Sequence, residues 1–279
     1  MIHTKNLFVA VALVAVAFLS CNSGGTKNED QPPTAAGASV LKEEPVSIQA
    51  DSTTLNCILA YDDSIRTRRP AVLVIPEWWG LVDYPKMRAK ELAKMGYVAL
   101  ALDIFGNGKI AQDPKEAQAL TAPFYMHPEK AKARIDAAIA QLKTYPQVDT
   151  NNIGAIGYCF GGGVLLNTVR LGDELKAVVS FHGSLLGTPA RKDLLKTKIL
   201  VCHGNSDSFT NSQVPEFKKQ MDSIGADYKF IGYDNATHAF TNPASDENAK
   251  KFNMPIAYNA RADSASWNAM KDFFKKNLK

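Results

Sequence analysis

The feature that most constrains the fold is an alternation of short apolar runs with amphipathic segments, from residue 46 to the C-terminus. Residues 71–76, 97–103 and 152–158 are mostly apolar, as strands buried on both faces are. Residues 128–143 place alanine, isoleucine and leucine on one face of a helix. This alternation predicts an α/β fold, with a mostly parallel sheet and helices on both faces.

Further segments continue the pattern in the same way. The predicted strands are 177–183, 198–204 and 228–233, the predicted helices are 83–95, 160–171, 213–225 and 260–277, and residues 47–50 and 55–61 suggest an opening hairpin. The last helix is expected to bury Ala262, Ala265, Ala269 and Phe273. Ligands of such sheets bind beyond the C-terminal ends of the strands, so functional motifs should lie where strands end.

The N-terminus predicts export. Lys5 precedes an apolar run at 7–19, which is too short for a membrane span of about 20 residues but typical of a secretory signal. Residues 18–21 resemble a bacterial lipobox, which predicts a signal at 1–21, lipidation of Cys21, and a lipid anchor on a membrane. The expected location is the periplasm or surface of a bacterium. An ordinary cleaved signal and an uncleaved anchor are the alternatives.

The next segment, 22–45, is rich in Gly, Pro, Ser, Thr and charged residues, and it predicts a flexible linker before a domain at 46–279. The 32 basic and 28 acidic residues are scattered, so nucleic acid binding is not expected. Cys57 and Cys202 lie in apolar runs and are expected as buried free thiols, with a disulfide between them as the alternative. No pair of ligands at zinc-site spacing occurs, so neither a metal nor a cofactor is expected.

One motif follows a strand and opens a helix: Gly157-Tyr158-Cys159-Phe160-Gly161. This setting is typical of a nucleophile elbow, with cysteine in the place of serine. The glycines leave room for a strained turn, and the helix N-terminus behind it favours a thiolate. A glycine-rich turn with a buried cysteine is the alternative.

Two further residues lie at strand ends in a matching order. Asp207 follows the strand at 198–204, and His238 follows the strand at 228–233. The order Cys, Asp, His is that of the α/β-hydrolase triad. The sequence therefore predicts an α/β-hydrolase fold in which Cys159 is the nucleophile, His238 the base and Asp207 the residue that orients the imidazole.

The loop after the strand at 71–76 reads Pro-Glu-Trp-Trp-Gly. In this fold that loop supplies one amide of the oxyanion hole, which predicts that the Trp78 N–H acts with the Phe160 N–H. Glu77 is then expected beside the thiol. Trp78 and Trp79 are expected to line the pocket or to pack in the core.

Taken together, PEWWG, GYCFGG, HGNSD and THAF resemble the dienelactone hydrolase (carboxymethylenebutenolidase) family over residues 46–279. The resemblance implies the triad Cys159, Asp207 and His238. It also implies a resting thiol paired with Glu77, which swings toward His238 when substrate binds.

The sequence departs from this family in the substrate pocket. Two arginines are expected to hold a substrate carboxylate, yet Asn107, followed by Lys109, and Asn242 stand in the corresponding segments. Neither asparagine replaces a bidentate arginine. His182 also ends a strand and either lines the pocket or is structural, whereas His127 is expected to be exposed.

The leading hypothesis is a hydrolase of small esters or lactones that works through an acyl-cysteine. The alternatives are a non-catalytic ligand-binding protein on the same fold, which the missing arginines favour, and a thiol-based redox or detoxifying protein. The sequence makes no prediction of oligomeric state.

Overall fold

A computed structural model of the chain describes residues 39–279. The predicted export signal at 1–21, the lipobox residue Cys21 and linker residues 22–38 lie outside the described residues. Among residues 39–279, no helix combines the length and the apolar character needed to cross a bilayer.

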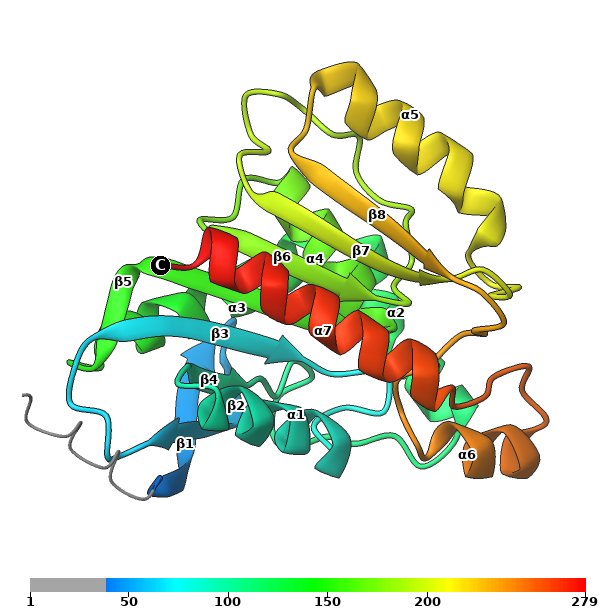
Figure 1. Cartoon of the computed structure of the whole chain (residues 1–279). Coiled ribbons are helices and arrows are strands. Elements are labelled where there is room, and N and C mark those ends of the chain that lie inside the picture. The colour runs from blue at the N-terminus through cyan, green and yellow to red at the C-terminus, as the bar shows by residue number, and fades with distance from the viewer. Residues whose placement is uncertain (1–38) are drawn as a thin grey trace, which may run out of the picture. The chain divides into compact units, whose positions relative to one another are not determined.

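An eight-stranded sheet forms the centre of the described part, in the order β1-β2-β4-β3-β5-β6-β7-β8 (Figure 1). β1 pairs antiparallel with β2, and β2 with β4, whereas all other neighbours are parallel. The strands are β1 Leu41–Ala50, β2 Thr53–Asp62, β3 Arg69–Ile75, β4 Val98–Ala101, β5 Val148–Tyr158, β6 Ala177–Phe181, β7 Lys198–Gly204 and β8 Tyr228–Tyr233. The mostly parallel sheet agrees with the sequence prediction.

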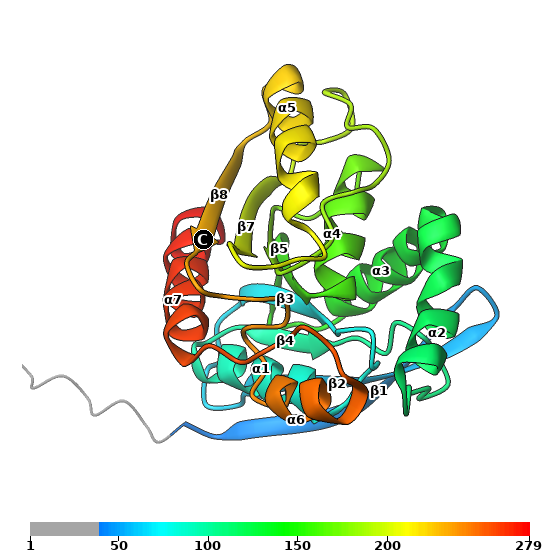
Figure 2. The same cartoon turned by 90° about the vertical axis from the view of Figure 1, so that its right-hand side faces the viewer.

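Helices cover both faces of the sheet (Figure 2). Helices α1 and α7 pack on one face and α2, α3, α4 and α5 on the other, while α6 lies near the edge where the parallel strands end. The helices are α1 Asp83–Lys94, α2 Pro114–Met126, α3 Pro128–Lys143, α4 Phe160–Arg170, α5 Val214–Ile224, α6 Ser245–Phe252 and α7 Ala260–Asn277, and a short 3-10 helix spans Asn211–Gln213.

Two apolar cores lie between these layers, and residues 71–75 of β3 contribute to both. Leu73 and Ile75 point into the core under α3 and α4, whereas Val72 and Val74 point into the core under α1 and α7. Because successive side chains of a strand face opposite sides, a strand covered on both faces needs apolar residues at every position.

Several helix ends follow from local residues. Asp113 caps α2 by accepting from the Glu116 N–H, and Asn259 caps α7 by accepting from the Ala262 N–H. Gly225 ends α5 in the left-handed conformation, which glycine adopts without strain.

The structure corrects the predicted boundary between linker and domain. Residues 41–45 belong to β1 rather than to the linker. Their charge and Pro45 suggest a loop, but β1 is an edge strand, where proline is tolerated because one side makes no ladder hydrogen bonds. Cys57 and Cys202 are buried free thiols, not a disulfide.

The predicted buried face of α7 is confirmed at Ala262 and displaced by one position after it. The buried side chains include Ala262, Ser266, Met270 and Phe274. Ala265 is exposed, whereas Ala269 and Phe273 are partly buried beside this face.

Candidate active site

Cys159 lies in the turn between β5 and α4 and has φ 51° and ψ −115°, a conformation rare for residues with a side chain. Its neighbours have no room for a side chain. A Cβ on Gly161 would lie 2.5 Å from the carbonyl oxygens of Ile75 and Pro76, and one on Gly157 would lie 2.3 Å from the Gly161 carbonyl oxygen. The glycines therefore permit the tight turn that presents the thiol at the end of β5.

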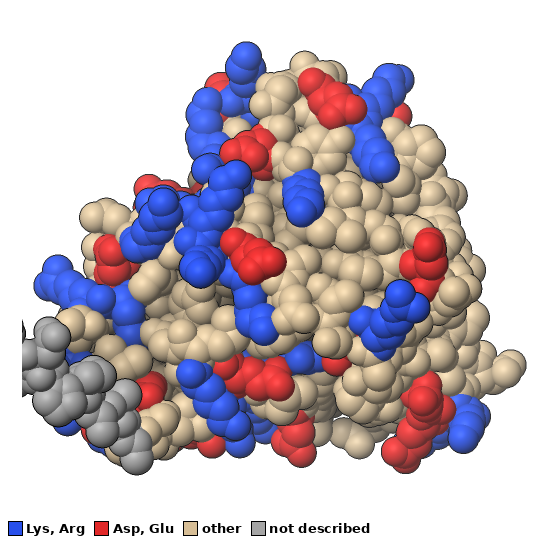
Figure 3. Space-filling view, in the orientation of Figure 1, with Lys and Arg blue, Asp and Glu red and all other residues tan. Residues whose placement is uncertain are grey.

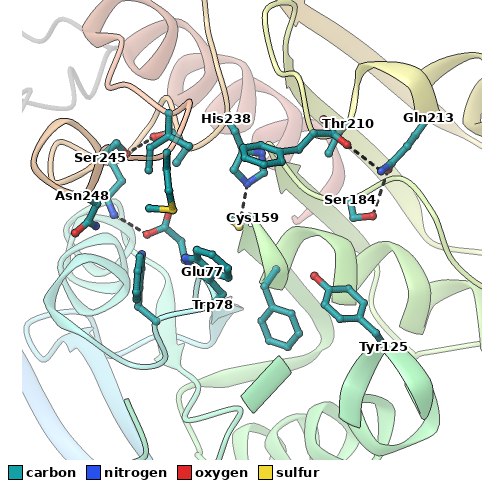
Figure 4. Close-up of a pocket in the computed structure, with 17 residues that line it drawn as sticks. Glu77, Trp78, Tyr125, Cys159, Ser184, Thr210, Gln213, His238, Ser245 and Asn248 are labelled. Atoms are coloured by element: carbon teal, nitrogen blue, oxygen red, sulfur yellow. Dashed lines mark hydrogen bonds between the residues drawn. The ribbon is translucent and has the colours of Figure 1, made fainter. Parts of the chain in front are cut away.

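Three strand ends bring Cys159, His238 and Asp207 into one hydrogen-bonded row. His238 Nε2 lies 3.0 Å from Cys159 Sγ, and His238 Nδ1 lies 2.8 Å from Asp207 Oδ2. Figure 4 shows the imidazole pointing at the sulfur. The structure thus places the three predicted residues together, although 79 residues separate Cys159 from His238.

Interactions within this row shift the pKa values of His238 and Asp207 in opposite directions, so that each favours the charged form of the other. Burial alone lowers the pKa of His238, but its charge and hydrogen-bond interactions with Cys159 and Asp207 outweigh burial and raise this pKa to about 10. Burial alone raises the pKa of Asp207, but hydrogen bonds from His238 and Thr210 hold it at about 2. The imidazole is therefore favoured in its charged form, next to a permanently ionised carboxylate.

The backbone N–H groups of Trp78 and Phe160 are available near the thiol. Within residues 39–279 neither group donates a hydrogen bond, and both residues line the same cavity as Cys159. The Gly161 N–H donates to the Pro76 carbonyl at 3.1 Å, which holds the loop after β3 against the start of α4. Two free donors from adjoining segments suit an oxyanion hole.

Glu77 lines the cavity but is not the partner of the thiol. Its side chain is buried, and Oε2 accepts from Asn242 Nδ2 at 2.6 Å. Burial raises the pKa of Glu77 to about 7, against the opposing effect of the Asn242 hydrogen bond. The resemblance implies a resting thiol paired with Glu77, but in this structure the thiol faces His238 instead.

The cavity around Cys159 has a volume of about 220 Å³ and lies where the parallel strands end. Trp79 and Asn242 line it, as the sequence suggests. Its wall also includes Tyr125 and Phe209, which the sequence analysis missed. Phe209 lies two residues after Asp207, so its position beside the triad offered a usable signal.

His182 and Asn107, by contrast, do not line the cavity. His182 lies behind the elbow, fully buried, where Nδ1 accepts from the Cys159 N–H at 3.1 Å and Nε2 lies 2.8 Å from Thr241 Oγ1. Burial and the charge on His238 lower the pKa of His182 well below its usual range, so its ring is neutral.

Asn107 is exposed because Asp103 turns the chain away from the cavity. The Asp103 carboxylate accepts from the N–H groups of Gly106 and Gly108, and the Asn107 N–H donates to the Thr54 carbonyl at 2.6 Å. His127 is exposed, as predicted. Within residues 39–279, no group of three or more His, Cys, Asp or Glu side chains could hold a metal ion.

A cysteine elbow at the end of a central parallel strand, in a sheet with helices on both faces, defines a member of the α/β-hydrolase class. A family model described as "Dienelactone hydrolase family" matches residues 55–278. The chain belongs to the dienelactone hydrolase family, and it is a hydrolase.

Similar proteins agree with this assignment. The chain is 30% identical to the protein usf of Aquifex pyrophilus, over 75% of this chain and 89% of that protein. It is 29% identical to the "Probable 2-oxo-3-(5-oxofuran-2-ylidene)propanoate lactonase" of a Bradyrhizobium species, over 72% of this chain and 81% of that protein. A dienelactone hydrolase-like promiscuous phosphotriesterase from metagenomic libraries superposes with a TM-score of 0.80 at 30% identity, covering 86% of this chain and 99% of that one.

Proposed function

We propose that the protein hydrolyses small carboxylic esters or lactones through an acyl-cysteine intermediate on Cys159. The observation that carries this proposal is the row Cys159–His238–Asp207 with both hydrogen bonds formed, and the raised pKa of His238 supports it. The relative named as a probable lactonase supports the same class of substrate.

In the first half of the reaction, the Cys159 thiolate attacks the carbonyl carbon of the ester, and the carbonyl π electrons move to oxygen. The Trp78 and Phe160 N–H groups hold this oxyanion. When it collapses, the carbon–oxygen bond breaks and the imidazolium of His238 gives its Nε2 proton to the leaving alkoxide. In a lactone the freed alcohol stays attached to the acyl group.

In the second half, water attacks the thioester while His238 takes its proton. The tetrahedral intermediate expels the Cys159 thiolate, the acid leaves, and the imidazolium–thiolate pair is restored. Asp207 holds the Nδ1–H throughout, which fixes the ring so that Nε2 faces the sulfur.

The test is the substitution Cys159→Ala, measured with phenyl acetate as substrate. We expect kcat/KM to fall by at least about a thousandfold, because no other group can form the acyl intermediate. Circular dichroism and the melting temperature should show that the protein remains folded. Cys202→Ala removes a buried thiol away from the cavity and should retain activity. Unchanged turnover in Cys159→Ala would contradict the proposal.

We also propose that the protein is an exported lipoprotein, anchored through a lipid on Cys21. The support is in the sequence alone: the positive start, the short apolar run and the lipobox-like residues 18–21. Cys21 lies outside the described residues.

A further inference from the structure

The cavity beside Cys159 contains no positively charged side chain other than the triad imidazole. Of the described residues that line it, none is a lysine or an arginine. The acidic side chain of Glu77 lies in its wall, and the Asp207 carboxylate stands directly behind His238. A carboxylate on a substrate would therefore enter a site that already carries negative charge.

Arg88 does not supply the missing charge. Arg88 acts electrostatically on Glu77 but is itself paired with Asp263 and Glu91. The basic side chains in Figure 3 are denser on the left, where the parallel strands begin, and sparser on the right, where they end. On the face that Figure 3 shows, the end of the molecule where the parallel strands end therefore carries few basic side chains that would attract an anion.

The neutral polar groups of the wall are mostly engaged with the protein itself. The Asn242 amide donates to Glu77, the Gln213 amide donates to the Phe209 carbonyl, and the Ser245 hydroxyl donates to the Ala239 carbonyl. A charged ligand group that lost its water beside these three side chains would recover few hydrogen bonds from them, which is costly.

Aromatic side chains supply the remaining contact surface. Tyr125 and Phe209 line the cavity and are 54% and 50% exposed, although both rings are apolar. Phe209 stands edge-on to the His238 ring, and Tyr125 stands edge-on to Phe160. In Figure 4, Tyr125 lies on the opposite side of the sulfur from Glu77 and Trp78. An apolar ligand would cover these exposed faces.

We infer that this pocket selects uncharged esters or lactones with an aromatic or extended apolar group and discriminates against substrates that carry a carboxylate. The inference rests on the proposed hydrolase function and specifies its substrate class.

Two matched pairs of esters test the charge selection. In the first, para-acetoxybenzoate and its methyl ester place the charge on the leaving group. In the second, phenyl hydrogen adipate and phenyl methyl adipate place it on the acyl group. With spontaneous hydrolysis subtracted, kcat/KM should favour the neutral member of each pair by at least about tenfold.

Equal or better turnover of the anionic member in either pair would overturn this inference and leave the proposed hydrolysis intact. If no ester in either pair were turned over in a Cys159-dependent manner, the proposed function would fall, and the inference with it. The two failures are therefore distinguishable.

Asn248, which lines the cavity from α6, offers a matched pair of variants. Asn248→Lys adds a positive charge and should shift the ratio of anionic to neutral kcat/KM by about tenfold toward the anionic ester. Asn248→Gln keeps the amide and should leave the ratio near that of the native protein. Equal ratios in the two variants would contradict an electrostatic origin.

Tyr125 tests the apolar part. Tyr125→Ala should lower the ratio of kcat/KM for phenyl butyrate to that for ethyl butyrate by about tenfold, because the aromatic contact is lost. Tyr125→Phe keeps the ring and should preserve the ratio. A ratio unchanged in Tyr125→Ala would contradict the role of the aromatic wall.

Discussion

Cys159 carries backbone strain, since a positive φ in a residue with a side chain costs about 1–3 kcal/mol. Its N–H is held twice, by the Phe181 carbonyl at 2.9 Å and by His182 Nδ1 at 3.1 Å. These two acceptors keep the strained turn in place and so present the thiol to His238. The strained residue and the proposed nucleophile are the same, which is typical of active sites.

At the residue scale, Glu77 gives a prediction for pH dependence. Its pKa in the folded protein is about 7, above the ordinary value of 4.5, so between these values the folded state binds more protons than the unfolded chain. Glu77 therefore makes the protein less stable as pH rises from about 4.5 to 7, by about 3 kcal/mol in total.

The variant Glu77→Gln should remove this loss. Its free energy of unfolding, measured with denaturant across this pH range, should exceed that of the native protein most at pH 7 and least at about 4.5. Equal pH slopes in the two proteins would contradict a raised pKa at Glu77. Because both proteins contain Asp207 and His238, the difference between their pH slopes removes the contributions of these two residues to the free energy of unfolding.

Single residues also show what the sequence could and could not predict. Cys159, Asp207 and His238 were locatable because each lies at or shortly after the end of a predicted strand, and parallel strands bring such ends to one edge. His182 follows a strand in the same way, yet its ring turns inward. That direction is set by the Cys159 N–H and by Thr241, contacts over 23 and 59 residues that no local pattern reveals.

At the scale of elements, a buried series of hydrogen bonds joins three segments behind the turn that contains Cys159. His182 follows β6, Thr241 follows β8, and Tyr84 belongs to α1. Since Nδ1 of His182 accepts from Cys159, Nε2 carries the proton and donates to Thr241 Oγ1, which also accepts from the Tyr84 hydroxyl at 2.7 Å. These hydrogen bonds connect the position of the proposed nucleophile to helix α1.

Thr241→Val should break this series of hydrogen bonds, because it removes the Thr241 hydroxyl. It leaves the buried Nε2–H of His182 without an acceptor, whereas the Tyr84 hydroxyl keeps the Thr241 carbonyl at 3.1 Å, so we expect a loss of about 2 kcal/mol in the free energy of unfolding. We also expect kcat to fall by about tenfold with little change in KM, because a looser His182 misplaces the thiol.

Thr121→Val is the matched control, since the buried Thr121 hydroxyl contacts only carbonyls of its own helix α2. It should cost less than about 1 kcal/mol and leave kcat unchanged. Similar stability and kcat in the two variants would contradict the role of this series of hydrogen bonds in positioning Cys159.

Helices α2 and α6 were not predicted from the sequence, although both carry residues that line the cavity. Helix α2 contains Pro123 and buries only Ala117, Thr121 and Phe124, so its apolar periodicity is weak. Because α2 carries Tyr125, one wall of the cavity could not be predicted. Helix α6, with a single buried side chain, is equally hard to detect.

At the scale of the whole molecule, the centre of the sheet was predictable because β3, β4, β6 and β7 are buried at nearly every position and are therefore mostly apolar. The pocket was not, because its walls come from α2, α6 and the loops that follow β3 and β7, whose mutual packing sets its shape. In the proposed function, the edge where the parallel strands end determines where the reaction occurs. Helices α2 and α6 and the loops determine which substrates fit.

The proposed anchor gives a prediction for the full chain. Expressed in a bacterium with its own N-terminus, the protein should incorporate labelled fatty acid and sediment with membranes. Cys21→Ala should lose the label completely, whereas Cys57→Ala should retain it, because Cys57 is buried in β2. Incorporation that persists in Cys21→Ala would contradict lipidation at this residue.

The most direct test of the whole account is to trap the covalent intermediate. Native protein and Cys159→Ala are mixed with excess phenyl acetate, quenched in acid within the first turnovers, and digested for mass spectrometry. We predict that the native peptide containing Cys159 gains the mass of one acetyl group, in step with a burst of phenol, and that the variant shows neither. Steady release of phenol with no acetyl group ever found on Cys159 would contradict the account.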